Sequence, residues 1–151
     1  LYPSYDGSRL SHACTAARLL EMPHVESIIQ IGIRCMNSAQ LETLDRHSTR
    51  VMVVEAGAPT EALLEKIGRD RGFPVYLSID LDGFDPAFAP GVSHPVPGGL
   101  SPRQIFDLFR SAKWELAGMD VVETNPSRDF NDLTSLLAAR LLHEGMGYTL
   151  K

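Results

Sequence analysis

The sequence has little of what marks secreted, membrane-spanning or nucleic-acid-binding proteins. Only two cysteines occur in 151 residues, Cys14 and Cys35, each inside an apolar segment. We therefore expect small buried thiols in a reducing compartment, and a cytoplasmic protein, rather than a disulfide framework. No apolar run approaches the roughly 18 residues of a membrane span. The net charge is −5 and runs of Lys or Arg are absent, which argues against nucleic acid and anionic membranes as partners.

The composition that remains is that of one globular domain. A length of 151 residues is enough to bury a sizeable core, and 44% hydrophobic with 22% charged residues is typical of folded soluble proteins. The chain opens with Leu1 and has no initiator Met. We therefore expect a fragment or a processed chain, in which any site built partly from upstream residues would be incomplete.

Segments with the patterns of strands and of helices alternate along the chain. Strands are predicted at residues 26–34, 50–55, 74–80 and 116–122, and helices at residues 11–21, 38–47, 60–71, from 101 onward, and 132–144. This alternation predicts an α/β domain with a mostly parallel sheet flanked by helices. In such sheets, ligands gather beyond the carboxyl ends of the strands.

Two of the helix starts carry capping signals. Before the helix that begins near residue 101, Ser101 is expected to cap, Pro102 to take the first helical position and Gln104 to complete a capping box. Thr60 is expected to cap the helix at residues 60–71.

Asp80 and Asp82 form the most conspicuous group of reactive side chains in the sequence, and they lie at the end of a strand expected to be buried. Being two residues apart, both carboxylates should point to one face of that strand, with Cα atoms roughly 6.5–7 Å apart. Two like charges that lose hydration repel each other, so a cation between them is expected, and a metal ion is the simplest candidate. The alternative is that Asp82 starts a turn and Asp80 caps a neighbouring element. On the pair alone the two readings are balanced.

The segment that follows favours the functional reading. Residues 83–100 form a long loop that contains four prolines and runs directly from the pair. Loops of this length are uncommon unless they have a functional role. Carboxylate oxygens suit Mg²⁺, Mn²⁺ or Ca²⁺, and also Zn²⁺ if imidazoles join them.

Glu123 ends the strand at residues 116–122 and is the second anchor. If that strand lies near the first, Glu123 shares the carboxyl-end rim with Asp80 and Asp82. A carboxylate there suits a guanidinium, whose planar donors allow bidentate pairing, although an isolated strand-end glutamate is more often only solvated. Asp120, in the same strand, is expected to pair with a neighbouring cation.

The remaining candidates are weaker taken singly. His12 follows Ser11 at a predicted helix start, where two interpretations stay open: a solvated end residue, or a group that moves protons near neutral pH. His94 lies on the long loop over the predicted site. Arg128 and Asp129 are expected to form a salt-linked loop.

Taken together, these segments resemble the ureohydrolase family, which contains arginase and agmatinase. The match is strongest in the Ser-x-Asp-x-Asp-x-x-Asp-Pro element, which is far more specific than a lone Asp-x-Asp, and it extends over nearly the whole chain. The segments that carry it are residues 78–86, 89–91, 97–100 and 119–126, with further likeness at residues 10–13 and 30–34.

The resemblance implies an arginase-like three-layer α/β fold and a pair of Mn²⁺ ions that activate water to split a guanidino group into urea and an amine. By position, it makes Asp80 and Asp82 metal ligands. It makes Glu123 the carboxylate that holds the guanidinium, and His12 the residue that shuttles protons at the mouth of the site. Both are thus expected to be catalytic and substrate-binding residues. It also implies a homo-oligomer, a trimer or a hexamer.

The departures from the family pattern bear on both completeness and substrate. The family's other metal ligands lie in upstream Gly-Gly-Asp-His and Asp-Ala-His-x-Asp segments, neither of which occurs here, and Leu1 resembles the residue just after the second. We therefore expect a single partial domain over residues 1–151, truncated at the N-terminus, that cannot assemble the two-metal centre alone. Residues 92–94, Val-Ser-His, replace a Thr-Gly-Thr common in agmatinases and are more similar to plant-type arginases.

These observations favour a manganese-dependent amidinohydrolase acting on a small guanidino substrate, agmatine or arginine first. Guanidino acids or formimino-glutamate are further substrate candidates. A second hypothesis is a non-catalytic member of the family that keeps the fold for assembly or regulation. A third is an unrelated Mg²⁺- or Zn²⁺-dependent hydrolase, against which the Pro-Gly-Gly-Leu segment and residues 123–126 argue.

Overall fold

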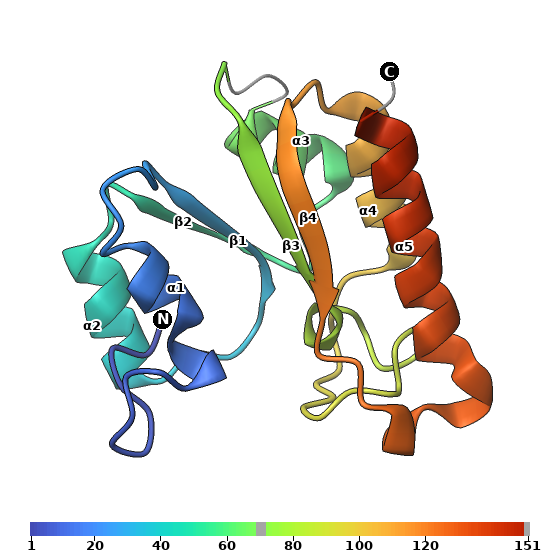
Figure 1. Cartoon of the computed structure of the whole chain (residues 1–151), viewed down its shortest axis with the longest axis horizontal. Coiled ribbons are helices and arrows are strands. Elements are labelled where there is room, and N and C mark those ends of the chain that lie inside the picture. The colour runs from blue at the N-terminus through green and yellow to red at the C-terminus, as the bar shows by residue number, and fades with distance from the viewer. Residues whose placement is uncertain (69–71, 150–151) are drawn as a thin grey trace. The chain divides into compact units, whose positions relative to one another are not determined.

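The computed structural model describes residues 1–68 and 72–149, and the chain divides into two compact units, Leu1–Val54 and Glu55–Lys151. The first unit contains η1 (His12–Cys14), α1 (Thr15–Leu19), β1 (Ile28–Ile33), α2 (Ser38–Arg46) and β2 (Val51–Glu55). In this unit β1 pairs with β2 (Figure 1). Leu1, Leu20 and Val51 form a buried cluster between the sheet and the helices.

Two expectations for this unit need correction. The helix predicted at residues 11–21 is a 3₁₀ turn followed by a short α-helix, because the backbone of Cys14 leaves helical geometry between them (φ −103°, ψ 1°). Cys14 is buried as expected, but Cys35 is exposed. Cys35 follows β1 at the point where the chain leaves the sheet, so its apolar neighbours do not bury it.

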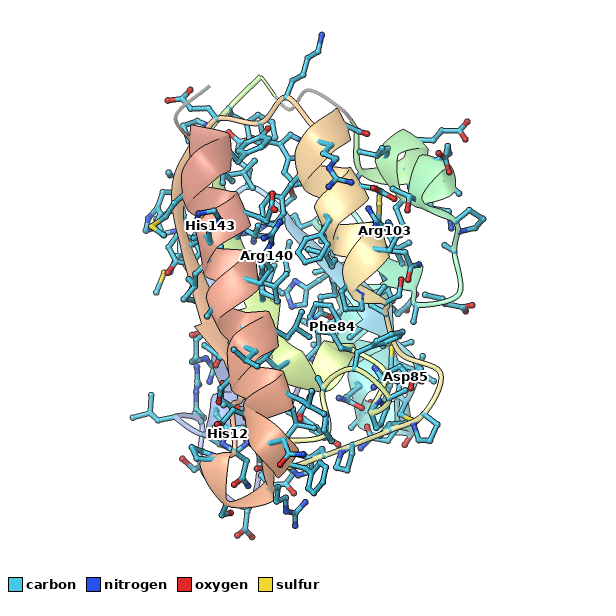
Figure 2. The ribbon with its side chains drawn as sticks, turned by 90° about the vertical axis from the view of Figure 1, so that its right-hand side faces the viewer. His12, Phe84, Asp85, Arg103, Arg140 and His143 are labelled. Atoms are coloured by element: carbon cyan, nitrogen blue, oxygen red, sulfur yellow. The ribbon has the colours of Figure 1, made fainter. Side chains whose placement is uncertain are left out.

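The second unit carries the long strands and helices. Its elements are α3 (Thr60–Ile67), β3 (Val75–Asp80), η2 (Leu81–Gly83), α4 (Pro102–Ser111), β4 (Leu116–Val122), η3 (Pro126–Arg128), η4 (Phe130–Asp132) and α5 (Leu133–Thr149). β3 and β4 pair in parallel, with Leu77 opposite Met119 and Asp80 opposite Val122. Figures 1 and 2 show α4 and α5 side by side over one face of this pair. Ile79 of β3, Leu108 of α4 and Leu141 of α5 are buried.

The helix starts confirm one capping prediction and correct the other. Ser101 and Gln104 form the complete capping box, and the Gln104 amide also donates to the carbonyls of Ala56 and Ala58 at 3.1 and 3.0 Å. In α3, Pro59 takes the cap position and Thr60 is the first helical residue, so Thr60 does not cap. Helix α3 ends at Ile67; residues 69–71 of the longer predicted helix lie outside the described residues.

Strand β3 is buried on one face only, whereas the sequence predicted a buried strand. Ile79 is 6% exposed on the face that α4 and α5 cover, but Tyr76 on the other face is 64% exposed. The hydroxyls of Tyr76 and Ser78 donate to the Asp120 carboxylate at 2.9 and 2.6 Å. Asp120 is therefore partnered by hydroxyl groups of the adjacent strand and not by the expected cation.

The capping box of α4 gives a first prediction. Replacing Ser101 with Ala leaves the Gln104 backbone N–H without its cap, so the free energy of unfolding should fall by about 1 kcal/mol. Urea denaturation followed by circular dichroism measures the change. Ser111→Ala, at the opposite end of the same helix, is the matched control. Equal stability of the two variants would contradict the capping role.

Candidate metal and guanidine site

The carboxyl ends of β3 and β4 bring three of the predicted site residues to one edge of the sheet. Because Asp80 is opposite Val122 in the parallel register, Asp82 and Glu123 both follow directly from adjacent strand ends. Figure 1 shows the two strand ends side by side, with the loop after β3 and the turn after β4 below them. The charges of Asp82 and Glu123 both act on the Asp80 carboxylate. The three carboxylates therefore form one electrostatic cluster.

The Asp80–Asp82 pair is arranged by a turn and not by a strand face. β3 ends at Asp80, and the chain passes into the 3₁₀ turn η2, where Asp82 lies. Oδ1 of Asp80 accepts a hydrogen bond from the backbone N–H of Asp82 at 2.8 Å and so caps that turn. The expectation that both carboxylates share a strand face is thus wrong, and the capping alternative holds for Asp80. Asp80 thus caps η2 and at the same time lies close enough to Asp82 for the two charges to interact.

Partial burial at the strand end raises the pKa of Asp80 to about 6, and the negative charges of Asp82 and Glu123 add to this effect. The Asp82 backbone N–H and the neighbouring His94 oppose it. A carboxylate in this state gains from a bound cation, because the cation offsets both the lost hydration and the repulsion. The lost hydration and the repulsion from which the sequence analysis predicted a cation are therefore both present at Asp80 in the structure.

His94, whose role the sequence left open, lies against Asp82. Its Nδ1 is 3.4 Å from Oδ2 of Asp82, and its backbone N–H donates to Oδ1 at 3.3 Å. The imidazole is 72% exposed, whereas the Asp82 side chain is 19% exposed. His94 thus covers the outer side of Asp82.

Glu123 has an unusual backbone. Its φ is +65°, in the left-handed region that side-chain-bearing residues seldom adopt. The turn directs the chain from β4 into η3 and leaves Glu123 half-buried at the strand end. Asp6, Asn131 and Asp132 also adopt positive φ, but Glu123 does so at a strand end beside two other carboxylates, at the residue that the sequence had proposed to hold a guanidinium.

The loop at residues 83–100 is closed on itself by Asp85. Its carboxylate accepts from the backbone N–H groups of Ala87, Gly98 and Gly99 at 2.9, 2.7 and 3.3 Å. Phe84 pairs with Leu100 and is buried under this closure (Figure 2). A Cβ at Gly99 would lie 2.3 Å from the Phe84 carbonyl carbon, so only glycine permits the approach. The proline-rich loop after the aspartates therefore has a defined conformation, fixed by its own hydrogen bonds and by the burial of Phe84.

Arg128 and Asp129 do not pair with each other as the sequence analysis expected. Arg128 donates to the carbonyl of Ser93 at 2.9 Å, which ties the turn after β4 to the loop after β3. Asp129 accepts from the backbone N–H groups of Thr134 and Ser135 at 2.8 and 2.9 Å and so caps α5. Each charged side chain thus bonds backbone groups that have no partner in regular secondary structure, and this takes the place of the ion pair predicted between them.

His12 lies in the other compact unit. It opens η1, it is exposed, and its carbonyl accepts from the Thr15 hydroxyl at 2.8 Å. The structure describes each unit by itself, so the role of His12 beside the three carboxylates stays a prediction.

The donor set at the strand ends suits a hard divalent cation but is small. Asp80 and Asp82 offer carboxylate oxygens, which Mn²⁺ and Mg²⁺ accept as ligands. Within residues 1–68 and 72–149, no group of three or more His, Cys, Asp or Glu side chains is arranged to hold a metal ion. The two carboxylates suit such an ion by ligand type, but they are fewer than the donors that its coordination requires.

The raised pKa of Asp80 predicts a pH dependence for the metal-free protein. The folded state holds the proton more tightly than an ordinary aspartate of pKa 3.8, so this stabilisation is complete below about pH 4 and is lost as the pH rises to about 6. The free energy of unfolding should therefore fall across this range, and Asp80→Asn should reduce that fall. Urea titrations at several pH values in EDTA measure both slopes. Identical slopes would contradict the assignment.

Comparison with known proteins identifies the family of the chain. Residues 1–147 match the model of the arginase family. The chain is 38% identical to arginase 1, mitochondrial, of Arabidopsis thaliana over 95% of its own length and 43% of the relative's. It is 35% identical to the N(1)-aminopropylagmatine ureohydrolase of Thermus thermophilus (97% and 50%). The agmatine ureohydrolase structure of Thermoplasma volcanium superposes with a TM-score of 0.85 at 32% identity (99% and 51%).

The chain thus spans about half the length of these relatives or less. None of the helices in the described residues is long and apolar enough to cross a membrane. The parallel strands flanked by helices agree with the α/β arginase-like fold expected from the sequence. Because the family model matches residues 1–147, which is almost the whole of this chain, the chain belongs to the arginase family.

Proposed function

We propose that this chain carries the carboxyl-terminal part of the active site of a manganese-dependent amidinohydrolase, which releases urea from a small guanidino substrate. The observation that supports this most is the convergence of Asp80, Asp82 and Glu123 at the ends of two paired parallel strands. Arginase and agmatine ureohydrolase relatives make arginine and agmatine the first substrates to test.

In this proposal Asp80 and Asp82 hold Mn²⁺. A bound metal pair would supply a water of lowered pKa as the nucleophile for the guanidino carbon. Burial and the charges of Asp82 and Glu123 disfavour the ionised Asp80 carboxylate, and a bound cation would offset both effects. Asp82 is held on its outer side by His94.

Glu123 accepts hydrogen bonds from the substrate guanidinium. Two parallel N–H···O bonds to one carboxylate fix the plane of the guanidinium as well as its position. The left-handed turn at Glu123 keeps its carboxylate in the cluster with Asp80. His12, which is exposed, is proposed to move protons between solvent and the leaving amine.

We further propose that the chain is one part of a larger ureohydrolase domain, whose other metal ligands lie outside these residues. Coverage of 43% of the Arabidopsis relative supports this. Assembly as a trimer or hexamer is part of the same proposal. The expected cytoplasmic location stays a prediction, because the named relatives include mitochondrial arginases.

The metal-ligand assignment predicts the effect of removing either aspartate in the full-length enzyme. Asp80→Ala or Asp82→Ala should lower urea release by at least about 100-fold and reduce the bound Mn²⁺, because each change removes a ligand. Activity is measured across agmatine, arginine and guanidinobutyrate, and metal content by atomic absorption. Asp107→Ala, at an exposed ion pair on α4, is the control. Wild-type activity in either variant would overturn the assignment.

The guanidinium assignment predicts a different pattern for Glu123→Gln. The neutral amide keeps the shape but loses the charge-assisted hydrogen bonds, so KM should rise about 10–100-fold with the Mn²⁺ content unchanged. Glu115→Gln, just before the start of β4 at the far end of the same strand, should leave KM unaltered. A loss of manganese in Glu123→Gln would instead make this residue a metal ligand.

A further inference from the structure

We infer that Thr134 and Asn125 are positioning residues for this reaction, because together they clamp Gly91 and thereby set the Glu123 carboxylate against the Asp80–Asp82 pair. The inference rests on the proposed function. The sequence predicted no role for Thr134, and it placed Gly91 and Asn125 only within segments that resemble the ureohydrolase family. The three residues connect the loop that follows the aspartates, the turn that follows the glutamate, and the start of α5.

Two hydrogen bonds hold the backbone of Gly91, one at its N–H and one at its carbonyl. Its N–H donates to the hydroxyl oxygen of Thr134 at 2.7 Å, and its carbonyl accepts from the backbone N–H of Asn125 at 2.8 Å. Gly91 is buried and Thr134 has no exposed surface. A Cβ on residue 91 would lie 2.7 Å from the Cβ of Asp129, so the absence of a side chain permits this contact.

Thr134 is also held by the Asp129 carboxylate that caps α5. Its backbone N–H donates to that carboxylate at 2.8 Å, and the neighbouring Ser135 hydroxyl donates to it at 2.7 Å. The Thr134 hydroxyl oxygen has lone pairs that can accept, and it receives the Gly91 N–H. Thr134 therefore relays the α5 cap to the loop.

The Asn125 side chain adds a second link in the same direction. Its amide N–H₂ donates to the Ser93 hydroxyl oxygen at 3.1 Å, and the next residue along the loop, His94, contacts Asp82. Asn125 is two residues from Glu123. The turn that carries Glu123 is thus bonded to the loop at Gly91 and at Ser93, and that loop bears directly on Asp82.

This arrangement explains what keeps a strained glutamate in place. A residue at φ +65° relaxes unless its surroundings hold it, and the clamp lies two residues beyond it. The Asp80 carboxylate and the Asp82 backbone N–H are joined by their own hydrogen bond at the end of β3, so the position of this pair does not depend on the clamp alone. Loosening the clamp should therefore displace Glu123 while leaving the metal ligands in position.

The test is Thr134→Val in the full-length enzyme, which removes the hydroxyl at nearly constant volume. Urea-release kinetics should show a KM for the guanidino substrate about tenfold higher, with the Mn²⁺ content unchanged. In the metal-free protein, amide hydrogen exchange should be faster in peptides covering residues 88–94 and 123–129. Thr134→Ser restores the hydroxyl and should return both readouts to near wild type. Thr124→Val, an exposed threonine next to Glu123, is the matched control.

Two outcomes would overturn the inference. One is a Thr134→Val variant whose KM and exchange match those of Thr134→Ser. The other is a loss of manganese in proportion to activity, which would mean a general structural role. If wild-type enzyme releases no urea from any guanidino compound, the proposed function fails, whereas the exchange data in metal-free protein still decide whether the clamp holds the Glu123 turn.

A second pair of variants keeps the inference testable if Thr134→Val does not fold. Asn125→Ala and Ser93→Ala each remove one side of the amide–hydroxyl bond and leave the backbone bond to Gly91 intact. Each should raise KM a few-fold, and the double variant should be no worse than the more affected single one, since both remove the same interaction. Additive effects would contradict the Asn125 role.

Discussion

The candidate site depends on the parallel register between β3 and β4. Because Asp80 is opposite Val122, the two strands end at the same level, and whatever follows each of them is brought to one edge of the sheet. A shift of the register along the strands would carry Glu123 about 3.3 Å per residue away from Asp80. α4 and α5, which cover one face of the pair, support this register through the buried side chains of Ile79 and Leu141.

Beyond the strand ends, the fold relies on backbone hydrogen bonding to side chains. Asp85 gathers three N–H groups of the loop after β3, and Asp129 gathers those that start α5. Each carboxylate replaces the regular partners that irregular backbone lacks. The loop at residues 83–100 is long and proline-rich, yet Phe84 and Val92 are nearly fully buried within it. Such a loop can hold reactive groups at fixed distances, which a flexible loop cannot.

Much of this was predictable from the sequence, and the failures have physical causes. Strand β4 and the capping box of Ser101 follow local patterns, so they were found at the right residues. The position of Asp82 was predicted wrongly because the strand periodicity was continued beyond the end of the strand, where Asp80 caps η2. The cation partner proposed for Asp120 was wrong because Tyr76 and Ser78 belong to a strand about 40 residues away, a distance over which no local pattern carries information.

The same limit explains why Thr134 and Asn125 were missed. A buried threonine at the start of a helix has the sequence appearance of an ordinary first-turn residue. Its role appears only when Gly91, far away in the chain, is seen to donate to it. The three carboxylates were found because they lie at strand ends within segments that resemble the ureohydrolase family. Their support was not, because it is made of common residues in tertiary contact.

The left-handed backbone at Glu123 has a consequence for engineering this domain. A design that optimises stability alone would favour glycine or asparagine at position 123, since either adopts a φ of +65° with less strain. Both would delete the carboxylate on which substrate recognition is proposed to depend. Stability and chemistry thus make opposite demands at this one residue. Variants selected only for thermal tolerance will tend to lose the glutamate first, while the surrounding fold remains intact.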